Sequence, residues 1–257
     1  MTGPHIGMRA TAWAATVVLG LTSGGVLGAG TARAGDPIDT LSARQIADRS
    51  SDALLSARSM HLSTRSTPAD GGAPTTLDLT VDRAGNCTGS VGLGGKQGSV
   101  QIVKRGDTVW VKPDADFWRN RDPSVGSALA AILAGRYMRG SASDPRLSSL
   151  ANACDLDTFQ KVVSDNATTD KGTLTKGKKT TLAGAPVVPL VRAWQGQKLT
   201  MYVAATGKPY PLRIDVTGGS PKADATVGFS AFDKPVPTAT PPPDETVDIN
   251  AQMTRAT

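Results

Sequence analysis

The stretch Val100-Gln101-Ile102-Val103-Lys104-Arg105-Gly106-Asp107-Thr108-Val109-Trp110-Val111 decides the fold of this 257-residue chain. Apolar residues recur at every second position on both sides of the turn Arg105-Gly106-Asp107, as in two half-buried strands. So short a connection joins antiparallel strands, because parallel strands need a long crossover. The stretch therefore predicts a β-hairpin with one apolar face and one wet face.

The same period of two recurs before and after this hairpin. Turns rich in Gly, Asn and Asp separate the segments, which favours further antiparallel pairs. The segments are Met60-Leu62-Thr64, Leu77-Leu79-Val81, Leu199-Met201-Val203, Leu212-Ile214-Val216 and Ala225-Val227-Phe229. The pattern predicts one large antiparallel sheet of about ten strands, and an open sheet of that size has to curl strongly.

Helical signals flank and interrupt the strands. A helix is expected over about 42–58, where Ser42 and Gln45 fit a capping box. A helical insert is expected near 114–170. It includes the apolar run Ser127–Tyr137, which is too short to span a membrane. The predicted fold is α+β, a curved half-barrel wrapped over helices around an apolar space that is either packed or open to a ligand.

The ends of the chain suggest three parts. Residues 1–34 read as a signal peptide, with Arg9 before an apolar run and Ala32-Arg33-Ala34 before the expected cleavage site. The alternative is that residues 1–34 are kept as a membrane anchor. In either case translation starts at Met1 or at Met8. Residues 35–234 are predicted to form one domain. Residues 235–257, rich in Pro and Thr, are predicted to form an extended tail with an edge contact at Val247–Ile249.

The two cysteines, Cys87 and Cys154, are expected to pair, because disulfides persist outside the cytoplasm. A metal site or a catalytic thiol is the alternative. With His61 as the one histidine of the mature chain, no metal site is expected. No cysteine follows the signal directly, so there is no lipobox cysteine to carry a lipid anchor.

Charge and motifs bear on function. The chain carries +6, and removing Arg9 and Arg33 leaves +4, which is mildly basic. The dense cluster Lys176–Lys179 reads as a hairpin tip, so no nucleic-acid partner is expected. The mature sequence holds no G-x-S-x-G, Walker or H-E-x-x-H motif, so we expect neither an enzyme nor a cofactor. Among the tryptophans, Trp118 is expected to be exposed, and Trp110 and Trp194 to pack in the core.

Segments along most of 40–240 resemble, in their order, the LppX/LprG-type (LppX_LprAFG) lipoprotein family of actinobacteria. They are Leu54–Leu62, Asn86–Val91, Val109–Pro113 with Asp116–Trp118, Met201–Ala204 with Gly207–Leu212, and Val227–Val236. The resemblance implies a LolA/LolB-like half-barrel with an apolar cavity that takes acyl chains, and binding without catalysis at the cell envelope. The missing lipobox cysteine departs from that family and favours a secreted protein.

The predicted function is a secreted, non-enzymatic, monomeric carrier or sensor that binds a lipid or acylated molecule. Envelope proteins are further candidate partners, and transient contact with the membrane is compatible with this function. The alternatives are a structural or interaction domain of the envelope with a filled core, and an uncharacterised hydrolase. The apolar run Ser127–Tyr137 is expected to face the segment Leu212–Val216 across the cavity. The residues predicted to line it are Leu79, Ile102, Leu129, Ile132, Leu133, Met201, Leu212, Ile214 and Val216.

Overall fold

The computed structural model describes residues 37–67, 75–121, 126–133, 135–169, 171–219 and 224–249. The chain divides into two units, Met1–Gly35 and Asp36–Thr257. The predicted signal peptide lies outside the described residues, so its cleavage stays a prediction. Every described helix and strand belongs to the second unit.

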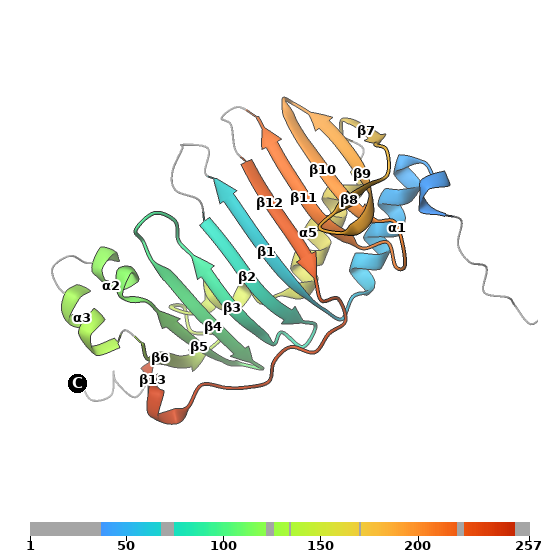
Figure 1. Cartoon of the computed structure of the whole chain (residues 1–257). Coiled ribbons are helices and arrows are strands. Elements are labelled where there is room, and N and C mark those ends of the chain that lie inside the picture. Colours follow the sequence, from blue (N-terminus) through green and yellow to red (C-terminus); the bar gives the residue numbers. More distant parts are fainter. Residues whose placement is uncertain are drawn as a thin grey trace, which may run out of the picture. The chain divides into compact units, whose positions relative to one another are not determined.

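Helices and strands follow one another as the sequence pattern predicts in outline (Figure 1). The helices are α1 (Ala43–Ser56), α2 (Ala115–Arg121), α3 (Gly126–Leu133), α4 (Ser148–Asn152) and α5 (Leu156–Thr168), with 3-10 turns at Ile38–Thr40 and Pro243–Glu245. The strands are β1 (Ser59–Thr67), β2 (Thr75–Asp82), β3 (Cys87–Gly92), β4 (Ser99–Arg105), β5 (Thr108–Pro113), β6 (Tyr137–Ser141), β7 (Thr173–Lys176), β8 (Thr180–Leu182), β9 (Ala185–Trp194), β10 (Gln197–Ala204), β11 (Pro211–Gly218), β12 (Asp224–Ser230) and β13 (Thr246–Asp248).

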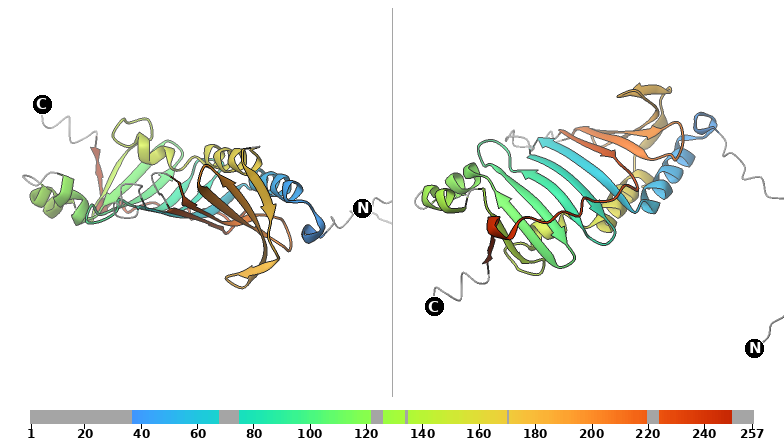
Figure 2. Two further views of the ribbon diagram at one scale, coloured as in Figure 1. Left: turned by 90° about the horizontal axis from the view of Figure 1, so that it is seen from above. Right: turned by 60° about the horizontal axis from the view of Figure 1, so that its bottom comes forward.

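All strands belong to one curved, unclosed sheet (Figure 2). Their order is β13-β6-β5-β4-β3-β2-β1-β12-β11-β10-β9-β7, with β8 beside β9. Two antiparallel meanders meet where β1 pairs with β12, which sets Leu62 opposite Phe229. The predicted α+β half-barrel is confirmed. The described residues hold 13 strands rather than the expected ten or so.

One face of the sheet carries the core, and α1 and α5 lie on that face (Figures 1 and 2). The capping box that begins α1 is formed as predicted. The Ser42 hydroxyl accepts from the Gln45 N–H at 3.2 Å, and the Gln45 side chain accepts from the Ser42 N–H at 2.9 Å. Ile46 and Leu54 of α1 are buried with the strand residues Met60 and Leu79. The apolar stripe of α1 is thus buried against the sheet.

The insert near 114–170 is not wholly helical, which corrects the prediction. The apolar helix ends at Leu133, and Gly135 has a φ of 82° that few other residues adopt. Strand β6 follows and pairs with β5, where the sequence pattern extended the helix to Tyr137. A five-residue strand without clean alternation gives too weak a signal to be recognised.

The disulfide between Cys87 and Cys154 is formed, as predicted, with a Cα–Cα distance of 5.5 Å. Cys87 begins β3, and Cys154 lies in the short link between α4 and α5. Both cysteines are buried in the core. The bridge therefore fastens the beginning of α5 to the first meander.

The predicted edge contact of the tail is also present. Strand β13 pairs in parallel with β6, with Val247 opposite Met138. Ile249 packs against the core next to this pair. The tail thus covers an edge that would otherwise expose unpaired backbone groups.

Candidate functional site

The inner face of the sheet is closed at one end of its strands and half-open at the other. In β2, Leu79 is fully buried, while Leu77 on the same face is only partly buried. In β12, Phe229 is buried and Val227 is partly buried. Because side chains two residues apart share a face, each strand runs from the packed core into a more accessible apolar surface.

Helix α5 is held over this face by polar contacts as well as by apolar packing. The Asp155 carboxylate begins the helix by accepting from the Thr158 N–H at 3.0 Å, and this hydrogen bond lowers the pKa of Asp155. Gln160 is buried, and its amide donates to the carbonyl oxygens of Leu54 at 2.7 Å and Ala57 at 2.9 Å. These carbonyls lie at the end of α1, where the Leu54 carbonyl also accepts from the Ala57 N–H and the Ala57 carbonyl from the Arg83 guanidinium. Gln160 joins the two helices by adding a second donor to each carbonyl.

Other apolar residues of α5 face the sheet or the solvent. The Phe159 ring lies 5.9 Å from the Phe229 ring, centroid to centroid. Val163, one turn on, packs partly buried against the core, and Val162 is 54% exposed. Phe159, Val163 and partly buried apolar residues of the same sheet face are here called the apolar strip. It consists of Phe159, Val163, Leu77, Leu199, Val216 and Val227.

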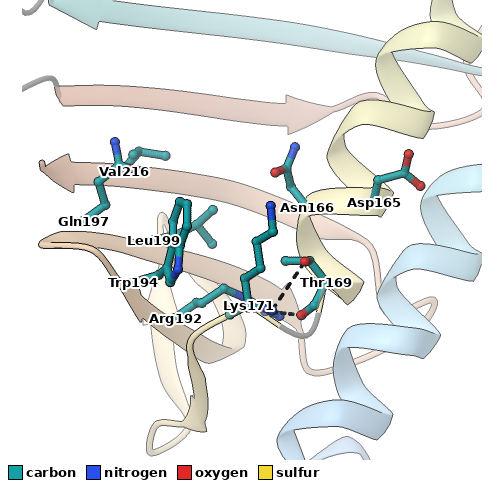
Figure 3. A pocket seen from close by; sticks show the side chains of 9 residues that line it. All are labelled: Asp165, Asn166, Thr169, Lys171, Arg192, Trp194, Gln197, Leu199 and Val216. Atoms are coloured by element: carbon teal, nitrogen blue, oxygen red, sulfur yellow. Dashed lines mark hydrogen bonds between the residues drawn. The ribbon is translucent and has the colours of Figure 1, made fainter.

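A pocket of about 260 Å³ lies at the end of the apolar strip near the last turn of α5 (Figure 3). Leu199 and Val216 supply its apolar wall. Its polar lining comes from α5, from the segment that follows α5, and from the hairpin between β9 and β10. These residues are Asp165, Asn166, Thr169, Lys171, Arg192, Trp194 and Gln197.

Arg192 builds the base of this pocket. It is only 7% exposed, and its guanidinium donates to the carbonyl oxygens of Ala167 and Lys171, each at 2.8 Å, and of Thr169. These carbonyls lie at the carboxyl end of α5, where the helix dipole is negative. The buried cation thus neutralises the helix end that borders the pocket.

Most of the residues predicted to line a cavity lie elsewhere. Four of them, Leu79, Ile102, Met201 and Ile214, are buried in the packed core. Val216 is the predicted residue that lines the pocket. Leu212 is half-buried beside a register shift between β10 and β11, and Leu133 is half-buried in α3. The side chains of Leu129 and Ile132 lie outside what the structure describes, and a cavity role for this set stays a prediction.

The apolar helix α3 does not face β11 as expected. It packs against α2, whose neighbour in the sheet is β4. Four strands, β3, β2, β1 and β12, separate β4 from β11. At about 4.8 Å between neighbouring strands, the two segments are too far apart to form opposite walls. The run of apolar residues predicted a helix that packs against another element of the fold, but it did not specify which element.

The tryptophans are also placed differently from expectation. Trp194, expected in the core, is 41% exposed at the pocket, with the Lys171 ammonium 5.5 Å from its ring centroid. Trp118, expected to be exposed, is half-buried and packs edge-on against Phe117. The sequence does contain a signal for this placement of Trp194, because Gly196 favours a turn two residues later. In the structure Gln195 and Gly196 both have positive φ, and Trp194 lies at the end of its strand.

His61 lies on the outer face, in a chain of contacts with a serine and an aspartate. Its ring nitrogens are 3.1 Å from Ser230 Oγ and 3.1 Å from Asp78 Oδ1. The order resembles a hydrolase triad, but a working triad buries its aspartate. The Asp78 side chain is 64% exposed, so water competes for the contact. The arrangement fits cross-strand polar pairing on a wet sheet face.

The described residues lack two other kinds of feature. No group of His, Cys, Asp or Glu side chains among them is placed to hold a metal ion. In the same part of the chain, no helix combines the length and apolar content needed to cross a membrane.

Comparison with known proteins bears on the fold. No protein-family model matches the chain, and no curated protein matches it. The structure is similar to that of LprF from Mycobacterium bovis, with a TM-score of 0.53 and 13% identity, over 77% of this chain and 96% of LprF. The lipoprotein LppX from Mycobacterium tuberculosis matches with a TM-score of 0.46 and 15% identity, over 77% of this chain and 98% of LppX. The two meanders and their helices thus form an LppX/LprG-type fold.

Proposed function

We propose that this protein is a secreted, non-enzymatic lipid-binding protein of the cell envelope that holds a hydrophobic chain on the apolar strip. The observation that carries the proposal is that strip itself, where Val216, Val227 and Leu199 remain partly accessible beside α5. An apolar surface that borders a pocket with a few polar groups at one end is the usual form of a small-molecule site.

The family resemblance supports the same conclusion from a different direction. The resemblance implies that lipoproteins of the LppX/LprG type take acyl chains between their sheet and helices, and this chain has the same type of fold. The predicted signal peptide and the disulfide favour a location outside the cytoplasm.

Binding of an uncharged probe tests this function. We expect a fluorescent long-chain alcohol to bind the purified protein, and native mass spectrometry of protein from its own host to detect a co-purified lipid. Val216→Asn puts an amide on the apolar strip and should weaken binding about ten-fold, because an unpaired amide is costly against a hydrocarbon chain.

Thr217→Asn is the matched control. Thr217 is the next residue of β11, points to the outer face and is exposed. The Thr217→Asn variant should bind the probe as the wild type does. If the alcohol does not bind, or if both variants weaken it equally while remaining folded, the apolar strip is not the site.

A domain with a filled core is the competing function. The fully buried Leu79 and Ile102 favour it for the closed end of the sheet. Absence of both co-purified lipid and probe uptake would decide for it.

A further inference from the structure

We propose that the pocket beside α5 binds the anionic headgroup of the lipid, with Lys171 as the cation that recognises it. This inference rests on the proposed function, because the hydrophobic chain of the same molecule would lie along the apolar strip. The ligand class is an amphiphile that carries a carboxylate or a phosphate.

The charges around the pocket leave one cation available. Asp165 lines the pocket, but its carboxylate is paired with the Lys161 ammonium at 3.0 Å. Arg192 is already committed to the carbonyl oxygens at the end of α5. In the described part of the chain, no hydrogen bond or ion pair engages the ammonium group of Lys171.

The position of Lys171 suits a ligand that enters from the apolar strip. In Figure 3 the Lys171 side chain is drawn between the indole of Trp194 and the last turn of α5, which carries Asn166. The indole lies 5.5 Å from the ammonium and restricts it by a cation–π contact. A side chain held in this way loses little further freedom when it binds an anion.

The rest of the pocket completes a headgroup site. Gln197 and Asn166 add neutral amide groups that can hydrogen-bond an oxyanion or its ester oxygens. Leu199 and Val216 continue from these amides into the apolar strip. At about 260 Å³ the pocket has room for a headgroup and the first part of a chain, but not for a whole lipid.

The helix end next to the pocket would repel an anion if it were bare. A helix carboxyl terminus carries about half a negative charge. Arg192, which lines the pocket, offsets that charge through its hydrogen bonds to the carbonyls at the end of α5 and leaves the field of Lys171 uncancelled. The same arginine thus explains how an anion site can lie at the unfavourable end of a helix.

The test compares three fluorescent probes that share one long alkyl chain and end in an alcohol, a carboxylate or a phosphate. At low salt the wild type should bind at least one anionic probe about five-fold tighter than the alcohol, the effect of one partly exposed charge contact. The tighter anion identifies the headgroup class. Salt at about 0.5 M should reduce the difference, since screening weakens exposed charge pairs.

Variants assign the effect to Lys171. Lys171→Gln should bind the anionic probes no better than the alcohol, and Lys171→Arg should keep most of the preference. Lys198→Gln removes a charge from the outer face of the neighbouring strand β10 and should behave as the wild type. Equal binding of all three probes to the wild type, or equal losses in Lys171→Gln and Lys198→Gln, would overturn the headgroup site while leaving lipid binding intact. Failure of every probe to bind would overturn both proposals.

Discussion

Replacing both cysteines, Cys87→Ala with Cys154→Ala, should destabilise the protein by about 4 kcal/mol. The bridge spans 67 residues, and in the chain-entropy model a closed loop of that length restricts the unfolded chain by about this amount at 25 °C. Because both sulfurs are buried, Ala avoids placing a hydroxyl in the core. For a domain of this size the melting temperature should fall by about 8–16 °C.

Urea unfolding followed by tryptophan fluorescence and circular dichroism measures the change. The double variant should unfold at lower urea with a somewhat steeper slope, because the unbridged unfolded chain exposes more surface, and the reduced wild type should match it. Hydrogen exchange should increase most in α4 and α5, which the bridge fastens to β3. A double variant within about 1 kcal/mol of the oxidised wild type would refute the reasoning, as would two free thiols in denatured, unreduced protein.

Three further predictions concern single side chains. Gln160→Leu should cost about 1–3 kcal/mol in urea unfolding, because it removes two buried hydrogen bonds to the carbonyls at the end of α1, each worth about 0.5–1.5 kcal/mol; an unchanged midpoint would contradict this. The Arg146 side chain holds the pKa of Asp144 at about 2, so this pair stabilises the fold above pH about 4 and loses its contribution as pH falls through about 2. In Arg146→Ala an NMR titration should find a higher Asp144 pKa that stays below about 4, because the backbone N–H at position 146 keeps its hydrogen bond; no rise would count against the contact. Ser230→Ala should leave any hydrolysis of p-nitrophenyl esters unchanged, whereas a loss shared with His61→Ala would reveal a catalytic site on the outer face.

Local rules predicted the parts of the fold that depend on neighbouring residues. The capping box of Ser42 and Gln45 needs only four consecutive residues, and the structure forms it. The period of two predicted the strands because each has one dry face. The pairing of Cys87 with Cys154 followed from there being two cysteines and an expected location outside the cytoplasm.

The candidate site was harder to predict because it depends on packing between distant segments. In α5 the polar residues Gln160 and Ser164 are buried together with Leu156 and Ala167, whereas Val162 is exposed. Gln160 can be buried because α1 ends beside it, and Ser164 because it hydrogen-bonds Ser51 of α1. Lys171 likewise gave no signal, since its role depends on the distant hairpin that carries Trp194.

The junction of the two meanders has a consequence for how the chain folds. His61 of β1 and Ser230 of β12 lie side by side, although 169 positions separate them in sequence. Each meander can form from local pairs, but closing the junction requires nearly the whole chain, and such long loop closures slow folding. Until β12 arrives, β1 is an open edge that can recruit a strand from another molecule. A chain truncated before β12 is therefore expected to associate through β1, even where its first meander has formed correctly.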